Sequence, residues 1–190
     1  MTEFPTLVSP RCIVNCITGD DIPEMREIFD DELTKRYLPE LKSLTRSNDK
    51  IKQMLKSFDV LFARNEGIIW GVRSSNTLVG FVAIIDISFN PTLIYATHPA
   101  YRQKGFMREC VPLLVRKAFE STKCSYILSE VHNDNKVSIG LLQSVGFCIV
   151  NRDRKKTYLR KIKDTPLESF EQYDVRRKTI GNLVGSGTSI

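Results

Sequence analysis

A long amphipathic segment at residues 105–119 lies between two β-branched runs, at residues 93–98 and 125–131. Its apolar side chains recur at helical spacing, which predicts a helix with one buried face. Strands joined through a helix of this length pair in parallel, because a parallel connection needs about a dozen residues or more. We therefore expect a mixed sheet that contains one β-α-β crossover.

Shorter alternating runs and further amphipathic segments complete the pattern. The runs at residues 67–73 and 77–87 flank a Ser-Ser-Asn turn, which is typical of a β-hairpin. The other expected elements are strands at residues 11–17, 147–150 and 157–162, and helices at residues 21–35, 47–62 and 136–145. Together they predict an α/β (α+β) fold with about seven strands and about four helices.

These elements all fall within residues 1–163, which are expected to form one domain. A capping pattern from Thr165 to Glu168 predicts one more helix, to about residue 178. The Gly- and Ser-containing stretch at residues 181–190 is expected to be flexible. Residues 164–190 are thus predicted to be a C-terminal extension of the domain.

Composition excludes several classes of protein. The 190 residues include 28 Lys and Arg against 22 Asp and Glu, a formal net charge of +6, which favours an anionic partner. No apolar stretch reaches the roughly 20 residues that a bilayer requires, and the first residues lack a signal-peptide pattern. A cytoplasmic protein without a membrane partner is therefore expected. With His98 and His132 as the histidines and no Cys-x-x-Cys motif, no metal site is expected.

The turn between residues 93–98 and the long helix has the features of an anion site. Backbone amides at a helix start have no intrahelical partner and lie at the positive end of the helix dipole. Gly105 allows a ligand to approach the backbone closely, and Arg102 and Lys104 add positive charge. These features predict phosphate binding, although a solvated turn without a ligand has the same residue types.

This turn also resembles a known motif. Arg102-x-x-Gly105-x-Met107 is similar to the pyrophosphate loop of the GNAT N-acetyltransferase superfamily. In that loop the pattern is Arg or Gln, two residues of any type, Gly, one residue of any type, and then Gly or Ala. The expected order of strands and helices is also the order of that superfamily.

Stretches that flank the turn are similar to the same superfamily. They are residues 78–82, residues 94–99, and Asn135-Lys-Val-Ser138 with Gly146-Phe147. The closest resemblance is to the branch that includes the RimJ and RimL ribosomal-protein N-terminal acetyltransferases. It extends over residues 11–162, which is most of the chain.

The resemblance implies a cleft in which acetyl-CoA binds, where the sheet splays between the fourth and fifth strands. The amide of Thr97 would face the thioester carbonyl, as an oxyanion donor does. Asn135 and Ser138 would face the pantetheine arm and the thiol. The cofactor-binding residues expected on this basis are Tyr95, Thr97, Arg102, Gln103, Lys104, Gly105, Phe106, Met107, Asn135 and Ser138.

Direct attack of an amine on the thioester requires no nucleophile from the protein, but protons must move. Many members of the superfamily use as acid a Tyr four residues before the Gly-Phe pair, where this chain has Leu142. The resemblance offers Ser138 instead, as a hydrogen-bond donor to the leaving thiolate. The alternative is that Asn135 is a helix N-cap and Ser138 an ordinary helix hydroxyl.

Three side chains could receive the proton of the acceptor amine. Asp86 lies near the end of the third expected strand, His98 ends the fourth, and Glu109 lies in the first turns of the long helix. An imidazole exchanges protons near neutral pH, and a carboxylate can act as base or as counter-charge to an ammonium. Proton transfer to solvent without a dedicated base is the further alternative.

The sequence therefore predicts an N-acetyltransferase that moves the acetyl group of acetyl-CoA to a primary amine, in a small molecule or at a protein N-terminus. It does not identify the amine, and it fits either a monomer or a homodimer. One alternative is a CoA-binding sensor without turnover, because Leu142 replaces the usual Tyr. Another is a basic protein bound to RNA or the ribosome. Nucleic acid is not the expected partner, because Tyr158 is the one aromatic residue near the basic residues 152–156.

Overall fold

The computed structural model describes residues 4–163. The strands are β1 (Leu7–Val8), β2 (Ile13–Asn15), β3 (Ile68–Ser74), β4 (Thr77–Ile85), β5 (Thr92–Thr97), β6 (Tyr126–His132), β7 (Cys148–Arg152) and β8 (Lys156–Ile162). The α-helices are α1 (Ile22–Asp30), α2 (Glu32–Tyr37), α3 (Asn48–Ala63), α4 (Phe106–Ser121) and α5 (Lys136–Ser144). Short 3₁₀ helices are η1 (Gly19–Asp21), η2 (Pro39–Arg46) and η3 (Pro99–Tyr101). The helix expected after Thr165 lies outside the described residues.

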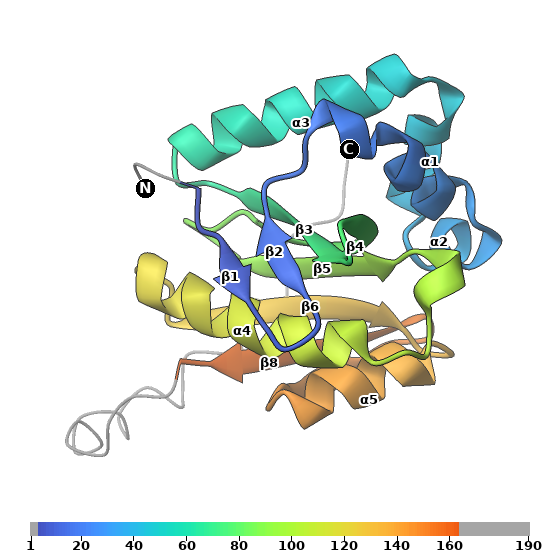
Figure 1. The fold of residues 1–190 in the computed structure, drawn as a ribbon. Coiled ribbons are helices and arrows are strands. Elements are labelled where there is room, and N and C mark those ends of the chain that lie inside the picture. The colour runs from blue at the N-terminus through green and yellow to red at the C-terminus, as the bar shows by residue number, and fades with distance from the viewer. Residues whose placement is uncertain (1–3, 164–190) are drawn as a thin grey trace, which may run out of the picture.

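The strands form one mixed sheet in the order β1-β2-β3-β4-β5-β6-β8-β7 (Figure 1). β5 and β6 pair in parallel, and α4 connects them, which confirms the predicted crossover. The described part of the chain has eight strands rather than seven. The additional strand is β1, whose two residues pair with Val14 and Ile13 and are too few to give an alternating pattern.

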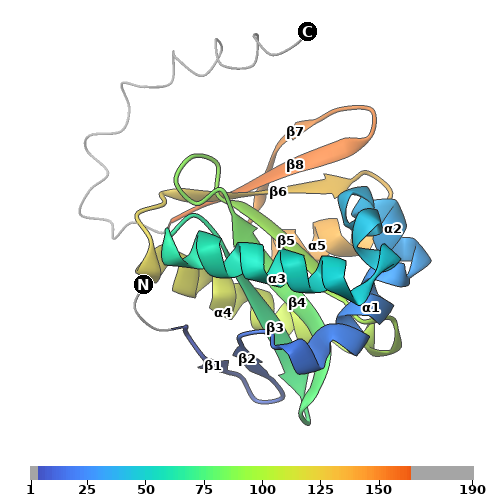
Figure 2. The same cartoon turned by 90° about the horizontal axis from the view of Figure 1, so that it is seen from above.

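Helices cover both faces of the sheet. α1, α2 and α3 lie on one face, and α4 and α5 lie on the other (Figures 1 and 2). Apolar side chains of α1 and α3 form a cluster with strand residues such as Phe81 and Ala96. Those of α4 and α5 form a second cluster with strand residues such as Val82 and Val131. No helix within residues 4–163 is long and apolar enough to cross a membrane.

The prediction of one helix at residues 21–35 is wrong, because the chain forms two helices there. α1 ends at Asp30, and Asp31 has an extended backbone, with φ −66° and ψ 137°. The Asp31 carboxylate accepts a hydrogen bond from the Thr34 amide at 2.9 Å and so caps α2. Arg102 binds the same carboxylate from a distant part of the chain, and no local pattern contains that contact.

Gly80 allows β4, β5 and α4 to pack closely at one end of the sheet. A Cβ atom at this position would lie 2.3 Å from Met107 Cε and 2.4 Å from the carbonyl oxygen of Ala96. Gly80 is the ladder partner of Thr97. The absence of a side chain therefore brings the end of β5 against the first turn of α4, which is where the sequence predicts the acetyl site.

Candidate functional site

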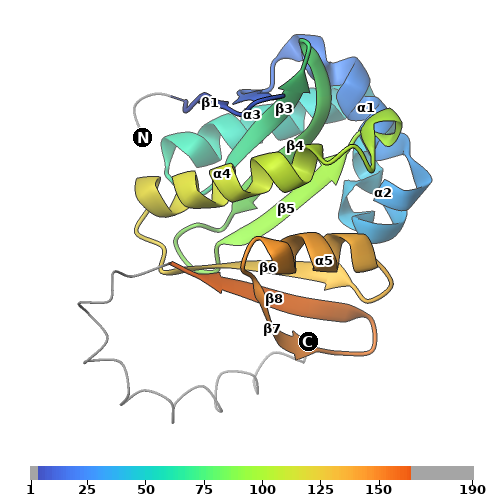
Figure 3. The same cartoon turned by 60° about the horizontal axis from the view of Figure 1, so that its bottom comes forward.

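β5 and β6 share little of their length. The two strands pair at Thr92 and Leu128, where the Leu128 amide donates to the Pro91 carbonyl at 2.7 Å. Figure 3 shows the two strands diverging from this shared end. We call the edge of β5 that faces β6 from residue 94 to residue 97 the diverging edge. The carboxyl ends of parallel strands meet at the same edge of a sheet, so the ends of β5 and β6 both flank it.

The hydrogen-bond register of β5 fixes which amides face the diverging edge. The His98 amide donates to the Val79 carbonyl at 2.9 Å, so this pair is a hydrogen-bonded pair of the antiparallel ladder with β4. Such pairs alternate with pairs whose amides and carbonyls point outward. The Thr97–Gly80 and Tyr95–Val82 pairs are of the outward kind, so the amides of Thr97 and Tyr95 point away from β4. This is the direction that the predicted role of Thr97 requires.

The loop before α4 leaves the start of that helix accessible. Gly105 is the N-cap residue, and no side chain caps the helix. Gln103, Lys104 and Gly105 are exposed, whereas the side chains of Phe106 and Met107 are buried. The backbone has φ +61° at Gln103 and φ +83° at Gly105. Left-handed turns of this kind at a helix start arrange backbone amides as an anion-binding concavity.

Arg102 does not extend toward this loop. Its guanidinium makes two contacts with the Asp31 carboxylate, one of them at 3.1 Å, and a third with Thr34 Oγ1 at 3.2 Å. Burial alone would raise the pKa of Asp31, but the hydrogen bonds from Arg102 and Thr34 outweigh it and lower the pKa. The Arg102 side chain therefore clamps the α1–α2 corner to the loop, and its charge is neutralised there.

Arg11, which the sequence analysis did not select, holds the loop from the other side. Its Nη1 donates to the Lys104 carbonyl at 3.0 Å, its Nε donates to Glu109 Oε2 at 2.8 Å, and the guanidinium lies 5.0 Å from the Phe106 ring centre. In a trans peptide the carbonyl and the next amide point in opposite directions, so this contact turns the Gly105 amide away from Arg11. The sequence carries no signal for a contact between residues this far apart.

Glu109 is engaged by the connection between β1 and β2. Its carboxylate accepts hydrogen bonds from the Ser9 hydroxyl at 2.6 Å and from the Arg11 amide at 2.9 Å, in addition to the Arg11 side chain. The bond from Ser9 is the main cause that lowers the pKa of Glu109, and the bonds from Arg11 add to it. As a candidate base Glu109 is thus an ionised carboxylate whose oxygens already have donors.

Ser138 and Asn135 lie at the start of α5, opposite the diverging edge. Asn135 Oδ1 accepts from the Ser138 amide at 3.2 Å, so Asn135 is the N-cap of α5. Ser138 Oγ lies 2.6 Å from the hydroxyl of Tyr95. Burial raises the pKa of Tyr95 to about 12, and the hydrogen bond with Ser138 opposes that rise in part. The structure brings these two hydroxyls together, which the sequence analysis did not anticipate.

Asp86 directly follows β4, whereas His98 directly follows β5 and bonds to Val79 near the start of β4. Asp86 follows the pair Ile85–Thr92, which is five ladder steps, or about 17 Å, from the pair Gly80–Thr97. His98 lies beside Thr97 but is 7% exposed, and both of its ring nitrogens have partners. Nε2 is 3.0 Å from Glu27 Oε2, and Nδ1 accepts from the Ala100 amide at 3.2 Å.

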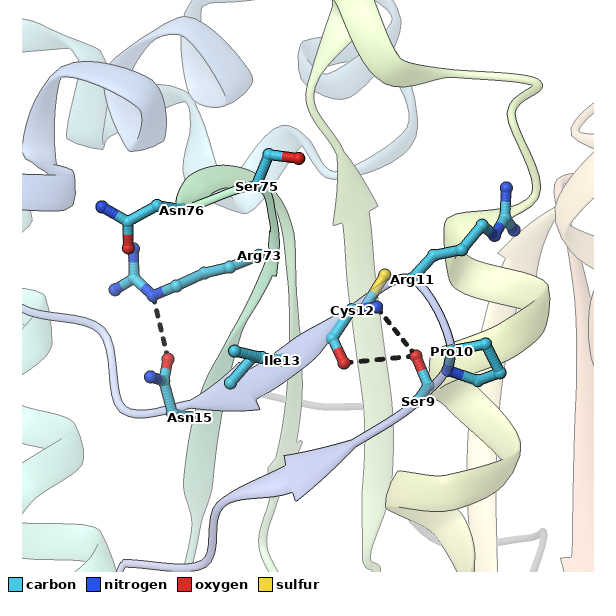
Figure 4. A pocket seen from close by; sticks show the side chains of 9 residues that line it. All are labelled: Ser9, Pro10, Arg11, Cys12, Ile13, Asn15, Arg73, Ser75 and Asn76. Atoms are coloured by element: carbon cyan, nitrogen blue, oxygen red, sulfur yellow. Dashed lines mark hydrogen bonds between the residues drawn. The ribbon is translucent and has the colours of Figure 1, made fainter.

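A cavity of about 390 Å³ lies apart from the diverging edge (Figure 4). It is lined by the connection between β1 and β2 and by the turn between β3 and β4, including Arg73 with its hydrogen bond to Asn15. In Figure 4 the Arg11 side chain extends away from Arg73, toward α4. None of the cofactor-binding residues expected from the sequence lines this cavity, so it is not the predicted site.

Comparison with known proteins finds a matching family and a curated relative. Residues 11–148 match the family described as acetyltransferase (GNAT) domain. The chain is 28% identical over 151 residues to an uncharacterized N-acetyltransferase, YoaA, of Bacillus subtilis, and the match covers 76% of this chain and 83% of that protein.

Solved structures with low sequence identity share the fold. One is RimL, a ribosomal-protein alpha-N-acetyltransferase in complex with coenzyme A, with a TM-score of 0.72, 12% identity, and coverage of 86% of this chain and 100% of that chain. Another is the ribosomal-protein-S5-alanine acetyltransferase from Vibrio fischeri, with a TM-score of 0.70, 18% identity, and coverage of 85% and 100%.

Proposed function

The chain belongs to the GNAT acetyltransferase family, and from this premise we propose that it transfers the acetyl group of acetyl-CoA to a primary amine by direct attack on the thioester. The amine is that of a small molecule or of a protein N-terminus. A cytoplasmic location, as a monomer or a homodimer, is part of the proposal.

One observation carries the proposal: outward-pointing amides and an uncapped helix start lie at the same edge of the sheet. The Thr97 and Tyr95 amides face the diverging edge, and the next α-helix, α4, follows with Gly105 as its N-cap and without a side-chain cap. The exposed loop between them suits a diphosphate, because its backbone supplies donors and its end of the helix dipole is positive. These features fit acetyl-CoA as the acetyl donor.

Each group would act on a different part of the reaction. The Thr97 amide donates to the thioester carbonyl oxygen, where negative charge develops as the amine attacks. The amides of residues 103–107 hold the diphosphate, and Lys104 adds charge beside them. Ser138 donates a hydrogen bond to the sulfur that leaves. Two of the bases that the sequence offered are less well placed: Asp86 lies about 17 Å along β4 from the Thr97 pair, and both ring nitrogens of His98 already have partners.

Thiol release tests the proposal directly. Purified protein is incubated with acetyl-CoA and a panel of small amines and short peptides with free N-termini, and free CoA is measured together with the mass of the acetylated amine. We expect transfer to at least one member of the panel. Gly105→Glu, which places a negative charge in the loop, should abolish CoA binding while the thermal unfolding midpoint stays measurable. Tight CoA binding without transfer to any amine would instead identify a sensor.

A further inference from the structure

The second histidine of the chain, His132, is the last residue of β6 and flanks the diverging edge. Counting four residues along each strand from the pair Thr92–Leu128 reaches Ala96 on β5 and His132 on β6. The two positions are thus level with each other where the strands have separated. Thr97, whose amide points to this edge, follows Ala96 directly.

His132 and Ser138 lie on opposite faces of the sheet. Val131 belongs to the apolar cluster formed with α4 and α5, so the alternation of strand side chains directs His132 to the other face. The Tyr37 ring of α2 lies 5.9 Å from the His132 ring, which confirms that direction. Tyr95, by contrast, contacts Ser138 on the α5 face. An acetyl group bound at Thr97 would therefore have the hydroxyl on one side and the imidazole on the other.

The hydrogen bonds of His132 fix its orientation. Its Nδ1 is bound to Asp134 Oδ1, and Asp134 Oδ2 is bound to Arg36 of α2. Burial would raise the pKa of Asp134, but the contacts with His132 and Arg36 outweigh it and lower the pKa. An ionised carboxylate accepts hydrogen bonds only, so the proton of the neutral ring resides on Nδ1 and Nε2 carries the lone pair.

The charges around His132 are paired within the part of the chain that the structure describes. Lys156, its ladder partner on β8, is bound to Glu130 Oε2 at 2.7 Å, and Arg36 is bound to Asp134. The His132 side chain is 37% exposed. His98 differs, because it is buried and Nδ1 accepts from a backbone amide.

We propose that His132, oriented by Asp134, is the base that takes the proton of the acceptor ammonium. This inference rests on the proposed function. The imidazole takes one proton from the ammonium, and the nitrogen lone pair forms the bond to the thioester carbon. The carbon–sulfur bond then breaks, and a second nitrogen proton passes to the thiolate. The products are the amide, CoA thiol and an imidazolium, which returns its proton to water.

Nitrogen-15 NMR of the imidazole rings tests the orientation without any substrate. The chain has two histidines, so two sets of ring signals are expected. The set that disappears in His132→Asn belongs to His132, and the set that remains belongs to His98. Well above pH 6.5, where an imidazole is neutral, we expect the proton of His132 on Nδ1 and that of His98 on Nε2. Asp134→Asn should move the His132 proton toward Nε2. A proton on Nε2 of His132 in the unaltered protein would overturn the proposal.

Kinetics test the role of the imidazole. The acceptor is the α-amino group of trialanine, and if trialanine is not acetylated, a member of the amine panel that is acetylated replaces it. Asn at position 132 keeps a donor for Asp134 but removes the base. We expect His132→Asn to lower kcat/KM about 100-fold at neutral pH. The deficit should shrink above about pH 9, where the α-amino group is already deprotonated. The KM for acetyl-CoA should change less than about twofold, because the substitution does not alter the residues expected to bind acetyl-CoA.

Asp49 is an exposed carboxylate on α3, so Asp49→Asn serves as the matched control for Asp134→Asn. In this control the position of the ring proton of His132 should be the same as in the unaltered protein. A His132→Asn variant with unchanged kcat/KM across the pH range would overturn the proposal. Failure of the unaltered protein to acetylate any amine would appear before any variant is made, and would overturn the proposed function and this inference with it.

Discussion

The hydroxyl of Tyr95 on β5 lies 2.6 Å from the hydroxyl oxygen of Ser138 on α5, across the line where β5 and β6 diverge. With a pKa raised by burial to about 12, the phenol keeps its proton throughout the neutral range. It can therefore donate to Ser138 Oγ. A hydroxyl has one hydrogen and two lone pairs, so the Ser138 hydrogen is then left for another acceptor, such as a leaving sulfur.

Removing these hydroxyls should affect turnover more than binding. We expect Ser138→Ala to lower kcat about 100-fold and Tyr95→Phe to lower it about tenfold, with little change in the KM for acetyl-CoA. The double variant should be no slower than Ser138→Ala, because Tyr95 acts through Ser138. Ser144→Ala, at the exposed end of α5, is the control. Additive losses in the double variant would mean that Tyr95 acts independently of Ser138.

Gly105 should be sensitive to the smallest side chain. Its φ of +83° is strained for other residues, so Gly105→Ala is expected to lower the free energy of unfolding by about 1 kcal/mol. It should also weaken CoA binding, measured by calorimetry, because relaxation of the loop turns its amides. Gly140→Ala on α5 is the matched control. A Cβ there meets nothing within 4 Å, so this variant should gain about 0.5 to 1 kcal/mol. Equal behaviour of the two variants would contradict this account.

The Asp31–Arg102 clamp should make stability depend on acid. The pKa of Asp31 is lower in the folded protein than its ordinary value, so its contribution is complete above about pH 4 and is lost as pH falls through the folded pKa. Asp31→Asn should lower the free energy of unfolding by about 2 kcal/mol at pH 7. The difference from the unaltered protein should narrow below about pH 4, as followed by urea unfolding. A constant difference at all pH values would count against the clamp.

Arg11 should matter for the cofactor more than for the fold. Its side chain is half exposed, but it holds the Lys104 carbonyl and so the direction of the Gly105 amide. Losing one charge-assisted hydrogen bond of about 1.5 kcal/mol corresponds to about a tenfold higher Kd for CoA in Arg11→Ala. Lys52→Ala, on exposed α3, removes the same charge elsewhere and should leave the Kd unchanged. An equal loss in both variants would indicate net charge rather than the Lys104 contact.

Local periodicity was sufficient for most elements of the fold. The strands around the hairpin turn and the helix after Ser47 have strong patterns, and the structure has β3, β4 and α3 there. The split at Asp31 was not predicted, because an Asp between two apolar turns has the pattern of a continuous helix. Asp31 caps α2 through the Thr34 amide, and it also binds Arg102, 71 residues away. Such a contact leaves no trace in hydrophobic spacing.

The candidate site divides in the same way. Thr97 and Gly105 could be selected because a motif and a helix start are local features of the sequence. Arg11 and His132 obtain their roles from partners on other elements, so their residue type alone gave no basis for assigning them. Glu109 was selected as a candidate base, but its contacts with Ser9 and Arg11 could not be predicted. The direction of the Thr97 amide likewise depends on the ladder register with β4, which only the folded sheet defines.

The short ladder between β5 and β6 has a consequence for motion. Main-chain bonding joins the two parts of the sheet at Thr92 and Leu128, so their association also depends on side-chain contacts, including the apolar cluster under α4 and α5 that contacts both parts. Attraction between apolar surfaces weakens on cooling, whereas a continuous ladder would be far less sensitive. We therefore expect relative motion of the two parts of the sheet to depend on temperature through the hydration of these apolar side chains.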